Sequence, residues 1–140
     1  MLSNERVLKT ILSDRGYSIT KPRLAIFDAL QGSSPLFMHE LVARLDTAVN
    51  RASVYRTIDL FEKLHITNRL SIGWKYKIEL SDTFNEHHHH IVCTICNKIE
   101  DLLENAALEH EILHLGTQHG YHIASHQIEL RGICLNCRKN

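Results

Sequence analysis

Four cysteines stand in two pairs that share one internal spacing, Cys93-x-x-Cys96 and Cys134-x-x-Cys137. Two intervening residues let both thiolates of a pair reach one ion, and two such pairs complete the tetrahedral sulfur shell that structural Zn²⁺ prefers. A redox pair is the alternative for a single motif of this kind. Two motifs in so short a segment favour zinc, which would tie the end of the chain back to residues 91–99.

A run of four consecutive histidines, His87 to His90, forms the second chemical feature. Alternate side chains of a strand point to opposite faces, so His87 and His89 would face one way and His88 and His90 the other. One strand would then supply two ligands to each of two metal sites; the alternative is a solvated polar strand. Mixed imidazole and carboxylate shells suit Zn²⁺, Fe²⁺ or Mn²⁺. The candidate partners are Glu79, Asp82, Asp101, Glu104, Glu109 and His126.

A third motif, His110-Glu111-Ile112-Leu113-His114, matches the H-E-x-x-H pattern of zinc proteases. In such an enzyme both histidines would bind zinc and Glu111 would activate water. The helix expected here is short, and no third ligand follows it in a recognisable pattern. We therefore interpret His110 and His114 as surface residues of an amphipathic helix and expect no enzyme. A small zinc hydrolase remains the remote alternative.

The charges and metal-binding residues divide the 140-residue chain into two segments. Residues 1–82 carry 12 Lys and Arg against 9 Asp and Glu, whereas residues 83–140 carry 4 against 7. All 4 cysteines and 9 of the 11 histidines fall in the second segment. This asymmetry predicts a polyanion-binding domain at 1–82 and a metal-binding domain at 83–140. Without a long apolar run or a secretory leader pattern, we expect a cytoplasmic protein with reduced cysteines.

Helical periodicity recurs four times in the first segment, over residues 5–15, 20–30, 38–45 and 50–65. Thr20 and Asn50 are the expected N-caps of two of these helices. The last helix would bury Val54, Ile58 and Phe61 and present a polar, basic face. Two helices joined by a tight turn, the second basic at its start, predict a helix-turn-helix whose second helix suits the major groove.

Two alternating stretches, residues 66–72 and 75–80, follow that helix around Gly73-Trp74. They predict a β-hairpin, the wing of a winged helix. In the second segment we expect strands at 87–92, 98–102 and 121–130 and a helix at 103–119. The expected helix would turn Leu108, Ile112 and Leu115 inward. The fold class is therefore α+β, a winged helix-turn-helix domain followed by a small α/β domain.

The order of these parts resembles the ferric uptake regulator (Fur) superfamily, which includes iron, zinc, manganese and peroxide sensors. The resemblance runs across nearly the whole chain, and its motifs occur in the order of the family. The matching stretches are Thr20-Lys21-Pro22-Arg23, Ala52-Ser53-Val54-Tyr55-Arg56-Thr57, His87-His88-His89-His90-Ile91-Val92-Cys93-Thr94-Ile95-Cys96 and Cys134-Leu135-Asn136-Cys137.

The resemblance implies a homodimer that binds palindromic operator DNA as a repressor when its sensory site holds metal. It implies DNA contacts by Ser53, Tyr55 and Arg56 of the recognition helix, and a phosphate contact by Arg23. The genes under control would serve metal uptake, of iron or zinc. A zinc-uptake or a peroxide-sensing member of the same family is the alternative.

The resemblance also distributes the ligands over three sites. The four cysteines would form the structural zinc site. The regulatory ion would be bound by Glu79, His88, His90 and Asp101, and a second ion by His87, His89, Glu109 and His126.

Two departures from the family leave alternatives open. The His-His pair of many iron sensors is replaced by residues 33–37, with His39 nearest, and Asp82 could replace Glu79 in the longer linker. The lack of a cysteine in this linker favours iron, whereas the unbroken histidine run is common in zinc sensors. The regulatory ion therefore stays open between Fe²⁺ and Zn²⁺, with Mn²⁺ a further option.

Overall fold

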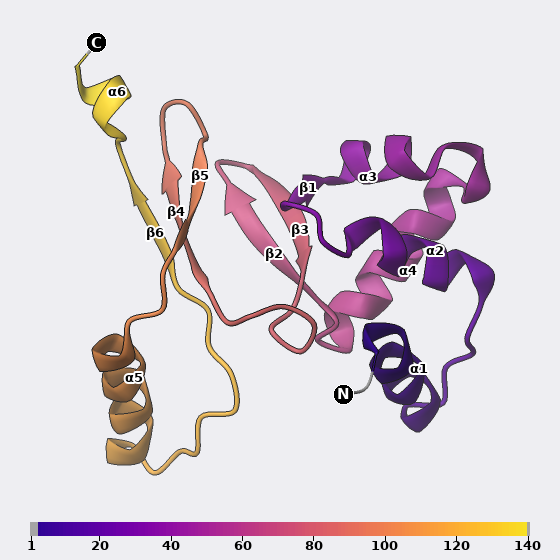
Figure 1. Cartoon of the computed structure of the whole chain (residues 1–140), viewed down its shortest axis with the longest axis horizontal. Coiled ribbons are helices and arrows are strands. Elements are labelled where there is room, and N and C mark those ends of the chain that lie inside the picture. Colours follow the sequence, from indigo (N-terminus) through magenta and orange to yellow (C-terminus); the bar gives the residue numbers. More distant parts are fainter. Residues whose placement is uncertain (1–2, 140) are drawn as a thin grey trace. The chain divides into compact units, whose positions relative to one another are not determined.

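The computed structural model describes residues 3–139, which divide into two compact units, one ending at Glu86 and one beginning at His87 (Figure 1). The first unit is mainly helical and the second is built on a small sheet. The α+β class expected from the sequence is confirmed. Among the described residues no helix combines the length and the apolar character needed to cross a bilayer.

Three of the four helices of the first unit begin where a polar side chain caps them. The side chains of Ser3, Thr20 and Asn50 accept hydrogen bonds from backbone N–H groups three residues later. Such caps satisfy donors that have no partner within the helix. The helices are α1 (Asn4–Asp14), α2 (Lys21–Leu30), α3 (Met38–Leu45) and α4 (Arg51–Lys63), with a 3-10 turn, η1 (Asp46–Ala48), between α3 and α4.

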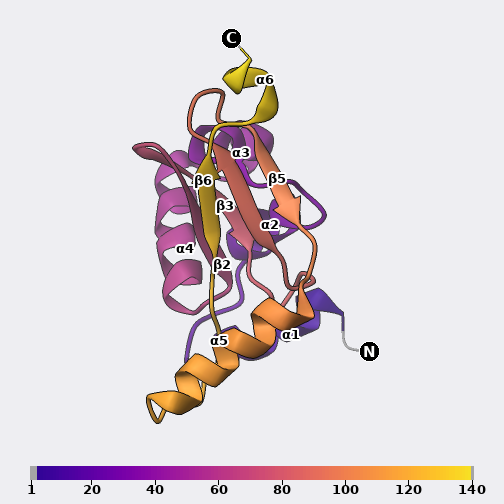
Figure 2. The same ribbon diagram turned by 90° about the vertical axis from the view of Figure 1, so that its left-hand side faces the viewer.

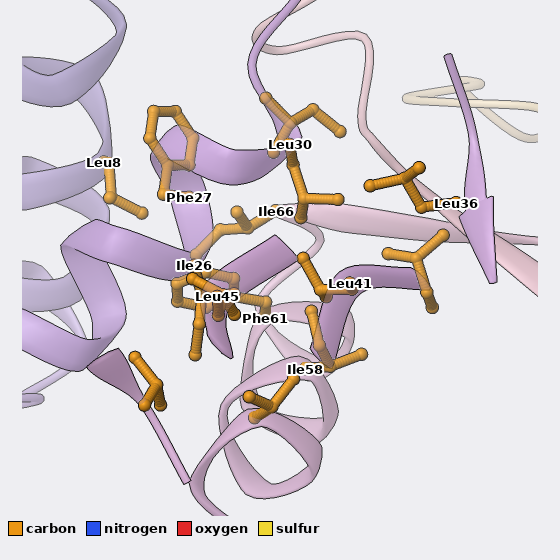
Figure 3. Close-up of a cluster of buried hydrophobic side chains, with 14 of the residues drawn as sticks. Leu8, Ile26, Phe27, Leu30, Leu36, Leu41, Leu45, Ile58, Phe61 and Ile66 are labelled. Atoms are coloured by element: carbon orange, nitrogen blue, oxygen red, sulfur yellow. The ribbon is translucent and has the colours of Figure 1, made fainter. Parts of the chain in front are cut away.

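Apolar stripes of all four helices meet in one core (Figure 3). Phe27 of α2 and Phe61 of α4 are fully buried there. Val54 and Ile58 complete the inner face of α4 as the periodicity predicts, whereas Thr57 is buried beside them. A well-packed core of this kind fixes the direction in which the opposite face of α4 points.

The hairpin that follows α4 forms the wing, and a short strand that precedes α3 joins it in a three-stranded antiparallel sheet. Its strands β1 (Leu36–Phe37), β2 (Thr67–Ile72) and β3 (Lys75–Leu80) lie in the order β1-β3-β2. Ile72 pairs with Lys75, so Gly73 and Trp74 alone make the turn. Gly73 has φ +61° and Trp74 does not have positive φ, which is the pattern of a two-residue type II′ hairpin. The two-residue strand β1 was not expected from the sequence.

The segment after β3 packs with the first unit. Phe84 is buried, and its ring meets that of Phe27 edge to face with centroids 4.9 Å apart. The backbone N–H groups of Phe84 and Asn85 donate to the carbonyl of Ser81. Residues 83–86, which the sequence analysis assigned to the second domain, therefore pack with the first.

The second unit is a three-stranded sheet with a helix beyond each end (Figure 2). Strand β4 (His89–Cys93) lies in the middle, antiparallel to β5 (Ile99–Leu102) and parallel to β6 (Glu129–Gly132). Helix α5 (Ala106–Gln118) connects β5 to β6, and the short helix α6 (Leu135–Arg138) ends the unit. His87 and His88 precede β4 rather than belong to it.

The strand expected at residues 121–130 is wrong over most of its length. Residues 121–128 are irregular, and only β6 pairs with β4. This segment packs against α5 at Gly116, where an added Cβ would lie 2.3 Å from Cγ1 of Ile123. A glycine therefore gives the irregular segment its close approach to the helix.

The inner stripe expected for α5 is not buried within the chain. Leu108 is 42% exposed and Leu115 54%, and Gly116 is the buried residue of the helix. In the described part of the second unit, Val92 and Cys93 are the buried hydrophobic side chains. The stripe is apolar, but this chain supplies too little apolar surface to cover it.

Candidate metal centres and nucleic-acid interface

The four cysteines converge at one end of the sheet of the second unit. Cys93 ends β4, Cys96 lies in the following turn, and Cys134 and Cys137 belong to the start and the body of α6. Their sulfur atoms lie within 4.8 Å of one another, and the Cys96–Cys134 pair is 3.9 Å apart. Tetrahedral coordination with Zn–S bonds of about 2.3 Å puts sulfur atoms about 3.8 Å apart. The cluster therefore fits a Zn²⁺ ion.

Backbone hydrogen bonds prepare one of these thiols for ionisation. The Sγ of Cys93 accepts N–H groups of Cys134, at 3.4 Å, and Cys96, at 3.5 Å, which lower its pKa to about 6. Hydrogen bonding with the neighbouring Cys134 sulfur, above all, raises the pKa of Cys137 to about 12. The thiolate is thus favoured at Cys93 and opposed at Cys137, and a cation bound by the four sulfur atoms would offset the opposition at Cys137.

Three histidines and one glutamate meet on one side of β4. The Nε2 of His89 lies 2.6 Å from Oε1 of Glu109, and the Nε2 of His87 lies 3.2 Å from the same oxygen. The Nε2 of His126 lies 2.7 Å from the other oxygen of Glu109 and 3.1 Å from the Nε2 of His87. Four donor atoms from β4, the segment that precedes it, α5 and the irregular segment thus point at one position.

The environment of Glu109 keeps it charged. Partial burial opposes the carboxylate, but hydrogen bonds with His89 and His87 outweigh that cost and lower the pKa of Glu109. A carboxylate with three imidazole nitrogens, one of them on the buried His89, is a donor set that fits a first-row divalent ion.

His88 and His90 lie together away from that cluster. Their rings meet edge to face with centroids 4.6 Å apart, and Nδ1 of His90 is 3.0 Å from Oδ1 of Asp101, its register partner on β5. Glu79 belongs to β3 of the first unit, opposite Asn68, and Asp82 follows that strand.

His39 is exposed, and its ring stacks on Phe37 at 5.5 Å between centroids. Neither Glu104 nor the His110-Glu111-His114 motif belongs to a metal-binding group among residues 3–139. All four of these side chains are exposed.

A cleft of about 400 Å³ in the first unit separates the start of α2 from α4. Arg23, Ser53 and Arg56 line it, and the Arg56 guanidinium donates to Oγ of Ser53 at 3.3 Å. Arg23 donates to the carbonyl of Ser18. Two guanidinium groups beside a helix N-terminus form a surface suited to phosphate. Tyr17, which no sequence pattern indicated, lines the same cleft, and its ring lies 5.9 Å from the Arg23 guanidinium.

The exposed face of α4 carries cations without acidic neighbours in its first turn. Tyr55, the fourth expected DNA contact, does not line the cleft; it is half-buried, and the guanidinium of Arg51 lies 5.6 Å from its ring. The face therefore presents guanidinium groups and the exposed part of an aromatic side chain that packs partly against the core.

Comparison with known proteins shows similarity over most of the chain. The model of the "Ferric uptake regulator family" matches residues 14–131. A ferric uptake regulation protein of Campylobacter upsaliensis is 33% identical over 138 residues, covering 92% of this chain and 85% of that protein.

Two solved structures are similar as well. The ferric uptake regulator of Francisella tularensis, solved with iron, is 26% identical at a TM-score of 0.67, covering 88% of this chain and 96% of that one. That of Vibrio cholerae, described as showing a rearrangement of its DNA-binding domains, is 26% identical at 0.68, covering 91% and 99%.

Proposed function

Because this chain belongs to the ferric uptake regulator family, we propose that it is a metal-responsive transcriptional repressor that binds palindromic operator DNA as a homodimer. Proteins of this family regulate transcription and are not enzymes, so the hydrolase alternative for His110, Glu111 and His114 is set aside. The repressor would act in the compartment that holds the DNA, the cytoplasm.

The proposal depends on one observation. The unit that follows the winged helix contains two separate groups of side chains that could bind metal. The cysteine group fits a structural Zn²⁺ ion. The group of His87, His89, His126 and Glu109 has the donor composition of a second, exchangeable site. A DNA-binding unit joined to a unit with exchangeable metal sites is the arrangement that a metal-dependent switch requires.

The proposed DNA contacts are Arg23, Ser53, Tyr55 and Arg56. Helix α4 would enter the major groove, where Arg56 and Tyr55 would reach base edges or the thymine methyl group. Arg23 would bind a phosphate at the start of α2. Arg23, Ser53 and Arg56 line one cleft, which supports a phosphate contact by Arg23 next to base contacts by α4.

Exposed apolar side chains on the second unit support the homodimer. Leu103 is 93% exposed, and Leu108 and Leu115 of α5 remain uncovered. An apolar surface of this extent on a unit with almost no core of its own favours burial against a second copy. The stripe that the sequence analysis assigned to the chain's interior would then lie at the dimer interface.

The regulatory ion is proposed to bind His88, His90 and Asp101 of the second unit together with Glu79 of the first. The ring of His88 meets that of His90, whose Nδ1 lies 3.0 Å from Asp101, so these residues would supply three donors, and a fourth is needed for a complete shell. Ligands from both units would make the ion favour one placement of the DNA-binding unit. The DNA-binding unit would exchange between a placement that fits the operator and one that does not. The ion shifts this equilibrium only if it binds more tightly to one placement than to the other.

Fe²⁺ is the proposed regulatory ion, and iron uptake the proposed process. The support is that the curated relatives carry the name ferric uptake regulation protein, and that the Francisella tularensis structure is described with iron. The alternative is Zn²⁺, which the imidazole-rich sites also accommodate.

The test is operator binding with and without metal. Operators are first selected from random duplexes with metal-loaded protein, and their affinity is measured with Fe²⁺, Zn²⁺, Mn²⁺ and a chelator. Metal should tighten binding about 5- to 150-fold, the usual range of allosteric coupling.

Substitutions show which residues produce the metal response and which ones contact DNA. Asp101→Asn should lose the metal response, whereas Glu100→Gln, one residue earlier, should keep it. Arg56→Ala should weaken DNA binding and keep the metal content. Equal operator affinity with metal and with chelator would reject the proposal.

A further inference from the structure

The tip of the wing carries the only tryptophan of the chain. Trp74 is 99% exposed, more than any other large hydrophobic side chain among residues 3–139. Hairpin turns of two residues favour glycine, asparagine and aspartate. A large aromatic side chain at this point adds nothing to the core and leaves its whole apolar surface in water.

The turn holds Trp74 in a defined position. Gly73 supplies the positive φ of a type II′ turn, and Ile72 pairs with Lys75 immediately beside it. A two-residue turn between paired strands leaves little freedom at its tip. The indole is therefore presented outward by a short and well-defined loop.

The wing is braced against the recognition helix. Nε of Arg69 on β2 lies 2.6 Å from Oε2 of Glu62, and its guanidinium lies 3.6 Å from Oδ1 of Asp59, both on α4. The ring of Tyr76 on β3 lies 4.2 Å from the same guanidinium. One arginine thus ties both long strands of the wing to α4, and it is engaged with protein carboxylates rather than available to phosphate.

Two lysines follow Trp74 on β3 and give this strand a positive charge. Lys75 follows Trp74 directly, and its Nζ lies 5.9 Å from the centroid of Phe37. The Nζ of Lys77 lies 4.7 Å from the same centroid, so both ammonium groups occur on the Phe37 side of the wing. A nucleic acid carries phosphate charges that lysines can bind, and its bases and sugars offer apolar surface between those charges. An exposed aromatic ring next to a strand with lysines is complementary to such a ligand.

We propose that Trp74 is a DNA-contacting residue that enters the minor groove next to the major groove occupied by α4. Apolar side chains inserted into minor grooves unstack base steps or cover sugar walls, and they favour deformable sequences. Lys75 binds the adjoining phosphates. This inference rests on the proposed repressor function, and it adds a contact at positions flanking those that α4 reads.

The single tryptophan permits a direct measurement. Its fluorescence is recorded with metal-loaded protein alone, with a selected operator duplex and with a duplex of scrambled sequence. The operator should shift the emission and protect the indole from acrylamide, and the scrambled duplex should do so far less. Unchanged acrylamide accessibility on the bound operator overturns the proposal. A spectral change that follows protein concentration without DNA assigns Trp74 to self-association and overturns it as well.

Variants separate an apolar contact from an ionic one. Trp74→Ala should weaken operator binding about tenfold, which corresponds to about 1.4 kcal/mol, because the apolar contact in the groove is lost. Trp74→Phe should recover most of that loss, and neither change should alter the thermal unfolding of so exposed a site. Lys75→Ala, the adjacent control, should reduce the slope of affinity against salt by about one, whereas Trp74→Ala should leave that slope unchanged.

Arg56→Ala distinguishes failure of this inference from failure of the function on which it rests. If Arg56→Ala loses operator binding while Trp74→Ala binds like the unaltered protein, the wing-tip contact is refuted and the repressor function stands. If the unaltered protein selects no duplex at all, both are refuted.

Discussion

Removal of one thiolate from the cysteine cluster should unfold the second unit and spare the first. The chosen change is Cys96→Ser, because a hydroxyl is a poor ligand for an ion that prefers soft sulfur. The loss of folding free energy should be large, because this unit has little core of its own. Among the described residues, its buried hydrophobic side chains are Val92 and Cys93. A structural zinc ion contributes about 10–16 kcal/mol to folding. Whole domains are stable by only about 5–15 kcal/mol.

The first unit has a separate core and needs no ion. Phe27, Ile58 and Phe61 are buried there among side chains of its own helices and wing. Loss of zinc should therefore leave α1 to α4 and the wing folded. Resistance to protease should be lost after Glu86, where the first unit ends.

The assay combines zinc analysis, limited proteolysis and circular dichroism. Thr94→Ser is the matched control, since it places the same residue in the same turn without removing a ligand. Cys96→Ser should bind no zinc at this site and yield a resistant fragment that ends close to Glu86. A Cys96→Ser protein whose second unit stays folded and protease-resistant would refute the reasoning, as would simultaneous unfolding of both units.

Three further substitutions test other parts of the structure. Glu109→Gln should remove one exchangeable ion per chain in metal analysis and leave the structural zinc. Hydrogen bonding lowers the pKa of Glu109, so the ionised carboxylate should stabilise the metal-free protein near neutral pH. This stabilisation should be lost as the pH falls through the lowered pKa. Urea denaturation of Glu109→Gln should lack this acid-sensitive loss of stability. Arg69→Ala should cost about 1 kcal/mol or less in urea denaturation, since its ion pair with Glu62 is partly exposed, yet weaken operator binding by loosening the wing; unchanged operator binding would contradict the bracing role. His65→Gly should stabilise the first unit by about 1 kcal/mol in the same assay, because His65 has φ +58°; lower stability would contradict this.

Local patterns predicted the first unit well. The N-cap Asn50 and the stripe Val54, Ile58 and Phe61 lie within one helix, so the sequence alone identifies both its start and its buried face. The wing followed from alternation on either side of Gly73. These features depend on neighbours a few residues apart, which periodicity and capping rules address.

The second unit shows where such rules fail. Residues 121–128 alternate like a strand, but they pack irregularly on α5 because Gly116 admits Ile123 and because His126 extends toward Glu109. The stripe of α5 was predicted to face a core that one chain does not possess. Packing between distant segments and burial by a second copy leave no periodic signal in a single sequence.

The candidate sites divide in the same way. The alternation of His87 to His90 predicted which pairs share a side, since this is a property of local backbone. The joining of Glu109 and His126 to His87 and His89 was expected only from the family resemblance, because the ligands come from elements far apart in sequence. Tyr17, which lines the cleft of Arg23, had no signal in the sequence pattern.

The central claim is that metal binding and operator binding favour the same arrangement of the protein. Such coupling is reciprocal, so operator DNA must raise metal affinity by the factor by which metal raises operator affinity. The decisive measurement is an anaerobic Fe²⁺ titration of zinc-containing protein with and without saturating operator duplex. Tighter Fe²⁺ binding in the presence of the operator is expected. Superimposable isotherms would contradict the claim.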